Sequence, residues 1–378
     1  MIIGCFKSWP AMMALVASLF LGITACGIGP AWKGSVKVGL VLPFYGYDSG
    51  SANAAYLAAK LILKERNEDG GIGGRWVELV ALDDQNSPDV AAHRAREMVL
   101  DPAVLGVAGH LSSDTALAAA AGYREAGLAA ITLGGSAEEL GLTFPELLRM
   151  APDDEVAASR ALQIISQHIP LRRIAVVYDR SPGHSAAAKA FLDVANRLNL
   201  ETRAKTGVER DQRDFASFFS ALFPNPPELL IFVGDQFQAA SFVAQARGAA
   251  LVSRILIAGC ADTPDFATIG RGGATGVLHT GYAAGADSAE AADFAGRYQS
   301  SHGQVPNTYA LAAGDAMRLL LDAIARALRA DSTLDRASVA RQIRVSRVGK
   351  FGEDGGRNGV EPLLFEIDES GFPGKLWR

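Results

Sequence analysis

A repeated alternation of short aliphatic runs with helical stretches is the feature of this 378-residue sequence that most restricts its fold. Residues 36–44, "VKVGLVLPF", predict a buried strand, and "SANAAYLAAKLILKERNEDGG" after it has the apolar spacing of a helix that ends at glycines. The same order returns with strand-like runs at 76–84, 103–109, 128–135, 172–179, 228–235 and 254–259. This rhythm is typical of βαβ units, whose strands lie parallel in one sheet.

The alternation forms two arrays that follow each other along the chain. The segment "LLRMAPDDE" at 147–155 interrupts both the strand and the helix period, and the chain length suits two domains. Further on, the Gly-rich segments at 276–288 and 349–359 predict breaks on either side of an Ala-rich helix near 308–329. We therefore expect one α/β array before about residue 150 and a second one after it.

The N-terminal segment has the features of a bacterial export signal. An apolar stretch from about residue 9 to 22 follows Lys7, and it is shorter than the roughly 20 residues that a membrane span requires. The string "ITAC" at 23–26 resembles the lipobox of bacterial lipoproteins, which implies cleavage before Cys26 and acylation of that residue. The alternative is a plain secretory signal with an incidental cysteine.

Charge and motif spacing argue against several classes of function. The formal net charge is −5, and no long basic run supplies the positive field that nucleic-acid binding needs. The nearest dinucleotide-like string, "GRGGATG" at 270–276, precedes a strand instead of linking a strand to a helix. The six histidines do not fall at the spacing of a helical metal site. We expect no nucleic acid, no metal and no cofactor.

The string "GHLSSDT" at 109–115 raises the question of a hydrolase. It does not match the G-x-S-x-G pattern, and neither does "PGHSA" at 182–186. His110 and Ser112 project to one face if the chain is extended there, but close neighbours in sequence rarely form a catalytic triad. The two side chains of each carboxylate pair, at 83–84 and at 138–139, point apart. They are expected to cap helices or to lie in solvent. The sequence therefore predicts a protein that is not an enzyme.

Two loops instead have the pattern of an anion-binding site. A strand that ends at Gly109 leads through Leu111, Ser112 and Ser113 into a helix, and a second strand leads through 134–136, "GGS", into another. The first N–H groups of a helix have no partner inside it, and they favour a carboxylate or similar anion. Ligands of open α/β sheets bind at the carboxyl ends of the strands, so both loops should face one crevice.

Segments spread over most of the chain resemble the Leu/Ile/Val-binding branch of the type I periplasmic binding proteins, the extracytoplasmic receptors of ABC importers. The resemblance runs from about residue 36 to 370, and its most specific part is "NEDGGIGGR" followed by "LVALDD". Other segments that carry it are "VKVGLVLPFYG", "GVAGHLSSDT", "ITLGGSAEEL", "RRIAVVYDR", "DFASFFSAL" and "VGKFGEDGG".

The resemblance implies an α/β fold of two doubly wound parallel-sheet lobes joined by a three-segment hinge. The implied crossings lie near 150–154, 278–283 and 348–352. Residues 36–150 and 283–348 then form lobe 1, and residues 151–282 and 349–378 form lobe 2. Residues 1–25 are the signal peptide, and 26–35 are the lipidated linker.

The resemblance also implies the ligand-binding residues. Ser112 or Ser113 and the loop with Gly134, Gly135 and Ser136 correspond to the groups that bind the ligand's carboxylate. Lobe 2 departs from the family pattern, because His184 stands where amino-acid receptors commonly have tyrosine. The ammonium partner stays open between Asp262 and the pair Asp235 and Gln236. Phe44, Tyr45 and Tyr47 are expected to form an apolar wall.

These observations predict a lipid-anchored solute-binding protein of an ABC importer. It is expected in the periplasm or an equivalent extracytoplasmic space, held to the membrane at Cys26, and in contact with permease subunits. The expected ligand is an amino acid or a related amide or acid with a carboxylate. The alternative is a sensor or regulatory lipoprotein of the same fold that acts on a periplasmic enzyme or receptor.

Overall fold

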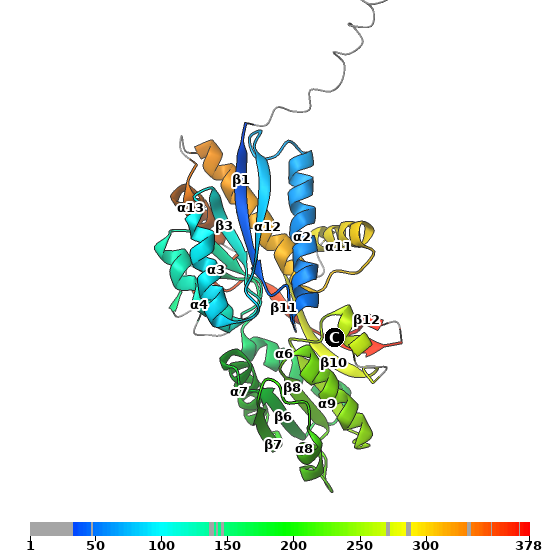
Figure 1. Cartoon of the computed structure of the whole chain (residues 1–378). Helices are drawn as coiled ribbons and strands as arrows, with labels where there is room; N and C mark the ends of the chain where they lie inside the picture. The colour runs from blue at the N-terminus through cyan, green and yellow to red at the C-terminus, as the bar shows by residue number, and fades with distance from the viewer. Residues whose placement is uncertain are drawn as a thin grey trace, which may run out of the picture.

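The computed structural model shows two α/β lobes stacked along the long axis of the molecule (Figure 1). It describes residues 33–46, 48–135, 140, 143–144, 147–269, 273–284, 289–330, 334–348, 350–369 and 371–378. Each lobe has its own sheet, and the fold class that the sequence and the resemblance predict is confirmed.

Lobe 1 contains a five-stranded parallel sheet with the strand order β2-β1-β3-β4-β5. Its strands are β1 (Ser35–Leu42), β2 (Trp76–Asp83), β3 (Val104–Gly109), β4 (Ala129–Thr132) and β5 (Leu148–Arg149). Its helices are α2 (Ser49–Glu68), α3 (Pro88–Leu100), α4 (Ser113–Glu125), α11 (Ala289–His302), α12 (Thr308–Ala330) and α13 (Arg336–Arg347).

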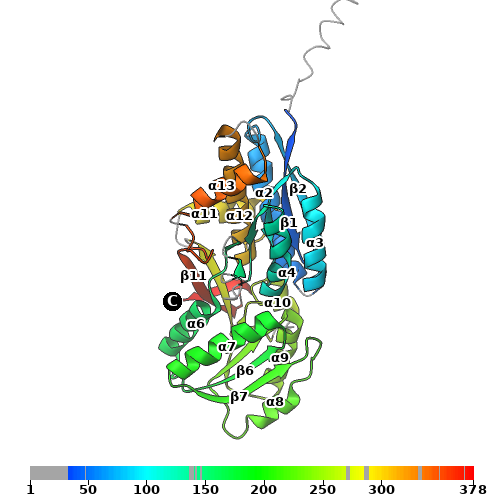
Figure 2. The ribbon, with the colours of Figure 1, turned by 90° about the vertical axis from the view of Figure 1, so that its left-hand side faces the viewer.

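Helices cover both faces of the lobe 1 sheet, as a buried parallel sheet requires. In β1, Val38 and Leu40 face the core under α2 and α12, and Val41 faces the core under α3 and α4. Strand residues alternate between faces, so this run of aliphatic residues fills both cores at once. Figure 2 shows α2 and α3 on opposite sides of β1 and β2.

Lobe 2 contains a seven-stranded sheet with the order β12-β11-β10-β9-β8-β6-β7. Its strands are β6 (Arg173–Asp179), β7 (Glu201–Val208), β8 (Leu229–Val233), β9 (Arg254–Ala258), β10 (Val277–Ala284), β11 (Val360–Asp368) and β12 (Gly371–Trp377). Its helices are α6 (Asp154–His168), α7 (Pro182–Arg197), α8 (Ala216–Ala221), α9 (Gln236–Gly248) and α10 (Pro264–Ile269).

The lobe 2 sheet is also covered on both faces. Ile174 and Val176 of β6 pack under α6 and α7, whereas Ala175 and Val177 pack under α8 and α9. The sheet is mixed rather than wholly parallel, because β11 runs antiparallel to both of its neighbours, β10 and β12. The predicted final strand at 361–368 does join lobe 2, as β11.

β7 and β10 were not predicted, because the sequence of each lacks the continuous aliphatic run of a buried strand. β7 is an edge strand, and only its last residue is fully buried. β10 lies inside the Gly-rich segment that predicted a break. Its Gly281 is needed for a close approach, since a Cβ there would lie 2.8 Å from Oγ1 of Thr308 on α12.

The chain passes between the lobes three times. The first passage follows β5 and precedes α6. β10 extends to Ala284, so the second passage lies after the predicted 278–283. Residues 355–357 still pair with Arg149 of β5, which places the third passage after the predicted 348–352. We propose that the boundary between the lobes is shifted accordingly, so that residues 350–357 belong to lobe 1.

Within the described ranges, no helix is both long enough and apolar enough to cross a membrane. The predicted signal peptide and Cys26 lie outside the described residues.

Candidate functional site

A cavity of about 410 Å³ lies between the two lobes, at the carboxyl ends of the parallel strands. In lobe 1 the strand order reverses between β1 and β3, and in lobe 2 it reverses between β6 and β8. Loops that leave neighbouring strands toward opposite faces open a crevice at such switch points. The loops after all four of these strands line the cavity, with Asp48, Ser112, Ser181 and Gly234 as members.

The N-terminus of α4 forms the lobe 1 side of the cavity. Ser112 is its N-cap: its Oγ accepts a hydrogen bond from the Thr115 N–H at 3.3 Å and lies 2.8 Å from Thr115 Oγ1. Leu111, Ser112 and Ser113 all line the cavity. The positive end of the α4 dipole is therefore directed at the cavity, as an anion site requires.

Two glycines allow the loops after β3 and β4 to approach this closely. Gly109 has a φ of +128°, and a Cβ there would lie 2.1 Å from the Val41 carbonyl oxygen. A Cβ on Gly134 would lie 1.9 Å from the Leu111 carbonyl oxygen. Gly134 and Gly135 line the cavity beside Ser113, while Ser136 lies outside the described residues. The described residues of both loops thus line the same cavity.

His184 of α7 lines the cavity on the lobe 2 side. Its Nδ1 lies 2.7 Å from Oδ2 of Asp179, a fully buried residue at the end of β6. Burial alone would lower the pKa of His184, but the hydrogen bond and the charge of Asp179, with smaller effects of Asp48 and Asp114, raise it above its ordinary value. Burial opposes ionisation of Asp179 as well, yet the bond from His184 lowers the pKa of Asp179 to about 2. The imidazolium form is thus favoured at the cavity.

Several hydrogen bonds join the lobes around the cavity. The Gly183 N–H donates to Oδ1 of Asp114 at 3.0 Å, and the Tyr309 hydroxyl donates to the Gly259 carbonyl at 3.4 Å. The Tyr282 hydroxyl also donates to the Leu133 carbonyl. The two lobes are therefore in contact over the cavity.

A comparison of this sequence with known protein families agrees with the architecture of two lobes around a cleft. The sequence pattern of the periplasmic binding proteins matches residues 35–357. The chain belongs to this family. The amino acid binding protein of Pseudomonas aeruginosa is 26% identical to it over 264 residues, which are 69% of each chain.

Solved structures show the same fold in other periplasmic binding proteins. The branched-chain amino acid transporter substrate binding protein of Streptococcus pneumoniae, in complex with isoleucine, superposes with a TM-score of 0.79 at 18% identity, over 90% of this chain and 99% of that one. The solute binding protein of an ABC transporter from R. palustris, in complex with benzoate, superposes with a TM-score of 0.74 at 18% identity. The match covers 91% of this chain and 95% of that one.

The predicted Asp262 lines the cavity of this periplasmic binding protein, but its carboxylate is already engaged. Asp262 Oδ2 accepts a hydrogen bond of 2.8 Å from the N–H of Thr308, the first residue of α12. The Asp262 carbonyl accepts a second bond, from Asn307 Nδ2, at 3.1 Å. The residue is only 3% exposed. Asp262 therefore holds the start of α12 from the other lobe.

Three other predicted residues do not line the cavity. Asp235 caps α9, because its Oδ1 accepts bonds from the N–H groups of Phe237 and Gln238, and Gln236 is buried with its Oε1 3.3 Å from Thr263 Oγ1. Tyr45 is 77% exposed. Asp235 follows β8, so the rule that site residues follow strands selected the correct loop but not the side chains that reach the cavity.

Asp48 and Asn86 line the cavity and were missed by the sequence reasoning. Asn86 Nδ2 donates to Asp48 Oδ2 at 2.5 Å. Asp48 lies in the loop after β1, beside the switch point of lobe 1. This position after the first strand is the sequence feature that could have indicated a binding residue.

The residues that suggested a hydrolase have structural partners instead. His110 is buried, with Nδ1 2.6 Å from Oδ2 of Asp84 and Nε2 3.1 Å from the Tyr123 hydroxyl. Neither ring nitrogen is left to accept a proton from Ser112. In the part of the chain that the structure describes, no three His, Cys, Asp or Glu residues form a group that could hold a metal ion.

Proposed function

We propose that this protein is the solute-binding component of an ABC importer and closes its lobes on a small solute with a carboxylate group. The observation that carries the proposal is the α4 N-terminus with Ser112 and Ser113, which faces an interlobe cavity of about 410 Å³. Cavities of this size suit small organic ligands. Relatives named as amino acid and Leu/Ile/Val-binding proteins support the ligand class.

The proposed mechanism is binding by lobe closure, with no bond made or broken. The ligand carboxylate lies at the α4 N-terminus and at the loop of Gly134 and Gly135. His184 and Ser181 approach from α7 and its N-cap, so the full set of contacts exists only in the closed form. A ligand that binds the closed form more tightly shifts the population toward it, and a permease can recognise that form.

Membrane anchoring completes the proposal. Acylation at Cys26 would keep the receptor near its permease, since several acyl chains together hold a protein firmly to a membrane. Treatment of growing cells with a labelled fatty acid tests this step. Label should enter the wild-type chain and should be absent from the Cys26→Ser variant.

A thermal-shift screen of the purified full-length protein in detergent tests the ligand class. Amino acids, their amides and organic acids are each added at a large excess. A ligand at 100 times its Kd adds about 2.7 kcal/mol to the free energy of unfolding, which shifts melting by several degrees. If no carboxylate-containing compound shifts the melting temperature, the proposal fails.

A further inference from the structure

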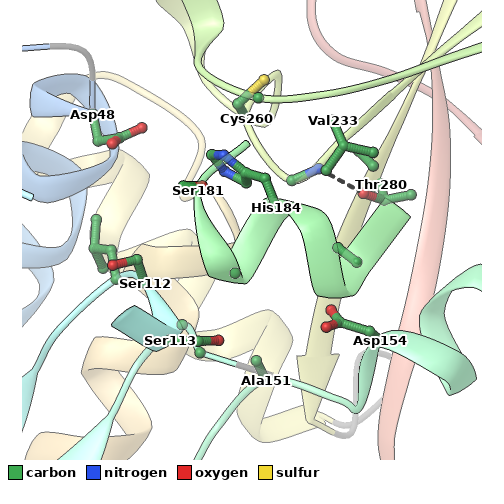
Figure 3. Close-up of a pocket in the computed structure, with 18 of the residues that line it drawn as sticks. Asp48, Ser112, Ser113, Ala151, Asp154, Ser181, His184, Val233, Cys260 and Thr280 are labelled. Carbon is green, nitrogen blue, oxygen red and sulfur yellow. Dashed lines mark hydrogen bonds between the residues drawn. The ribbon is translucent and has the colours of Figure 1, made fainter. Parts of the chain in front are cut away.

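The loop after β1 places a carboxylate opposite the anion site of the proposed ligand cavity. Asp48 comes from lobe 1, and Figure 3 shows its carboxylate pointing across the pocket toward His184 on α7 of lobe 2. Asn86 holds one oxygen, Oδ2. Among the described residues, no hydrogen bond or ion pair engages Oδ1.

The charge of Asp48 acts on other residues of the cavity lining. It raises the pKa of His184, and it is among the causes that raise the pKa of Cys260 and of Tyr309, two further residues of the lining. These three residues belong to α7, to the loop after β9 and to α12. Asp48 lines the same cavity as these three residues, so a ligand in the cavity would meet its carboxylate.

The described lining is acidic overall. It contains the carboxylates of Asp48, Asp114, Asp154 and Asp262, against the cations Arg210 and His184. Asp114 and Asp262 already accept backbone N–H bonds from the other lobe. The cations Arg210 and His184 favour the charged form of Asp48, yet burial outweighs them and raises its pKa. A carboxylate in this position gains from one more positive charge.

We propose that Asp48 binds a positively charged nitrogen of the ligand, so that the solute is a zwitterion that carries an ammonium group besides its carboxylate. The assignment rests on the proposed function and defines the ligand class of the same cavity. It differs from the family resemblance, which placed the ammonium partner in lobe 2, at Asp262 or at Asp235.

The assignment explains why closure would depend on the ligand. Closing the lobes removes water from Asp48, and an uncompensated carboxylate resists this transfer. An ammonium group that pairs with Asp48 compensates the loss of water only in the closed form. Such a ligand therefore binds the closed form more tightly than the open form, which is the condition for a population shift. A plain carboxylic acid would fill the anion site but offer no partner to Oδ1 of Asp48.

Matched ligand pairs that differ only in the amine test the assignment. Leucine is compared with 4-methylpentanoate, phenylalanine with 3-phenylpropanoate, and 4-aminobutanoate with butanoate, by calorimetric titration of the full-length protein in detergent. In any pair that binds, the amine should bind at least about tenfold more tightly, which is the scale of a charged hydrogen bond. Asp48→Asn should reduce this ratio to about threefold or less.

Variants separate this inference from its alternatives. Asp89→Asn changes an exposed carboxylate on α3 and should leave the ratio at its wild-type value. If Asp262→Asn removes the amine preference while Asp48→Asn keeps it, the ammonium lies in lobe 2 and the assignment is overturned. Equal binding of acids and amines to the wild type overturns it as well, but leaves the proposed function standing. Binding of no member of any pair removes both.

Discussion

The carboxylate of Asp114, in the first turn of α4, accepts a hydrogen bond of 3.0 Å from the backbone N–H of Gly183, in the first turn of α7. This bond joins lobe 1 to lobe 2 beside the cavity. It also places a negative charge at the positive end of the α7 dipole, which is a favourable position. The contact exists only when the lobes are close together.

Replacing Asp114 should therefore weaken the closed form more than the fold. Asp114→Ala removes one charge-assisted bond of about 1.5–3 kcal/mol, and ligand affinity should fall by roughly 10-fold to 150-fold. Calorimetric titration measures the affinity, and small-angle scattering of the liganded protein should show a more open molecule. Asp89→Ala is the matched control, because it removes the first-turn carboxylate of α3 without an interlobe bond. Equal losses of affinity in both variants would contradict a role of the bond between Asp114 and Gly183 in holding the closed form.

Ser112 should contribute to both stability and binding. Ser112→Ala removes the α4 N-cap, which costs about 1 kcal/mol of stability, and it also removes the hydroxyl that faces the proposed carboxylate. Asp335→Ala is the control, since Asp335 caps α13 in a capping box with Ser338, and neither Asp335 nor Ser338 lines the cavity. Urea unfolding should show similar losses for the two variants. Only Ser112→Ala should lower ligand affinity. If this variant binds the ligand as tightly as the wild type, the ligand's carboxylate does not bind at Ser112.

The close approach of β3 to β1 should make Gly109 intolerant of a side chain. Gly109→Ala combines a φ of +128° with a Cβ only 2.1 Å from the Val41 carbonyl oxygen, so we expect a loss of about 2–4 kcal/mol. Gly127→Ala is the control, because it has a φ of +61° and no atom within 4 Å of its Cβ. That variant should lose only about 1 kcal/mol. Chemical unfolding of both proteins measures the difference. Equal losses of stability would mean that the positive φ accounts for the whole effect and that the close contact with Val41 adds nothing.

Most of the fold could be predicted from the sequence because strand burial and helix spacing are local signals. The runs that became β1, β3, β6, β8 and β9 are aliphatic on both faces, since both faces of each sheet are covered by helices. β7 escaped prediction because an edge strand needs few apolar residues. β10 escaped because Gly281, read as a break, instead makes room for Thr308 of the other lobe.

The site was predicted on one side and not on the other for a physical reason. Ser112 and Gly134 follow strands whose ends are clear in the sequence, and a helix N-terminus indicates an anion without knowledge of the other lobe. The roles of Asp48 and Asp262 depend on distances between lobes. Asp262 is bound to Thr308, 46 residues later in the chain, and Asp48 is the carboxylate that points toward His184. No local pattern contains that information.

The pair of His184 and Asp179 should make stability depend on pH in a defined direction. The folded protein raises the pKa of His184 above its ordinary 6.5 and lowers that of Asp179 to about 2. The stability from His184 is thus fully present below about pH 6.5 and is lost as pH rises through the raised value. The stability from Asp179 is present above about pH 4 and is lost as pH falls toward 2.

His184→Gln should therefore lose more stability in mild acid than in base. We expect a difference below about 1 kcal/mol between about pH 5.5 and about pH 9, since the side chain is 34% exposed and its ion pair is screened. Urea unfolding at the two pH values measures it, with His93→Gln, an exposed histidine of α3, as the control. A larger loss in base than in acid would contradict the assignment, because it would mean that the neutral imidazole is the form that the fold favours.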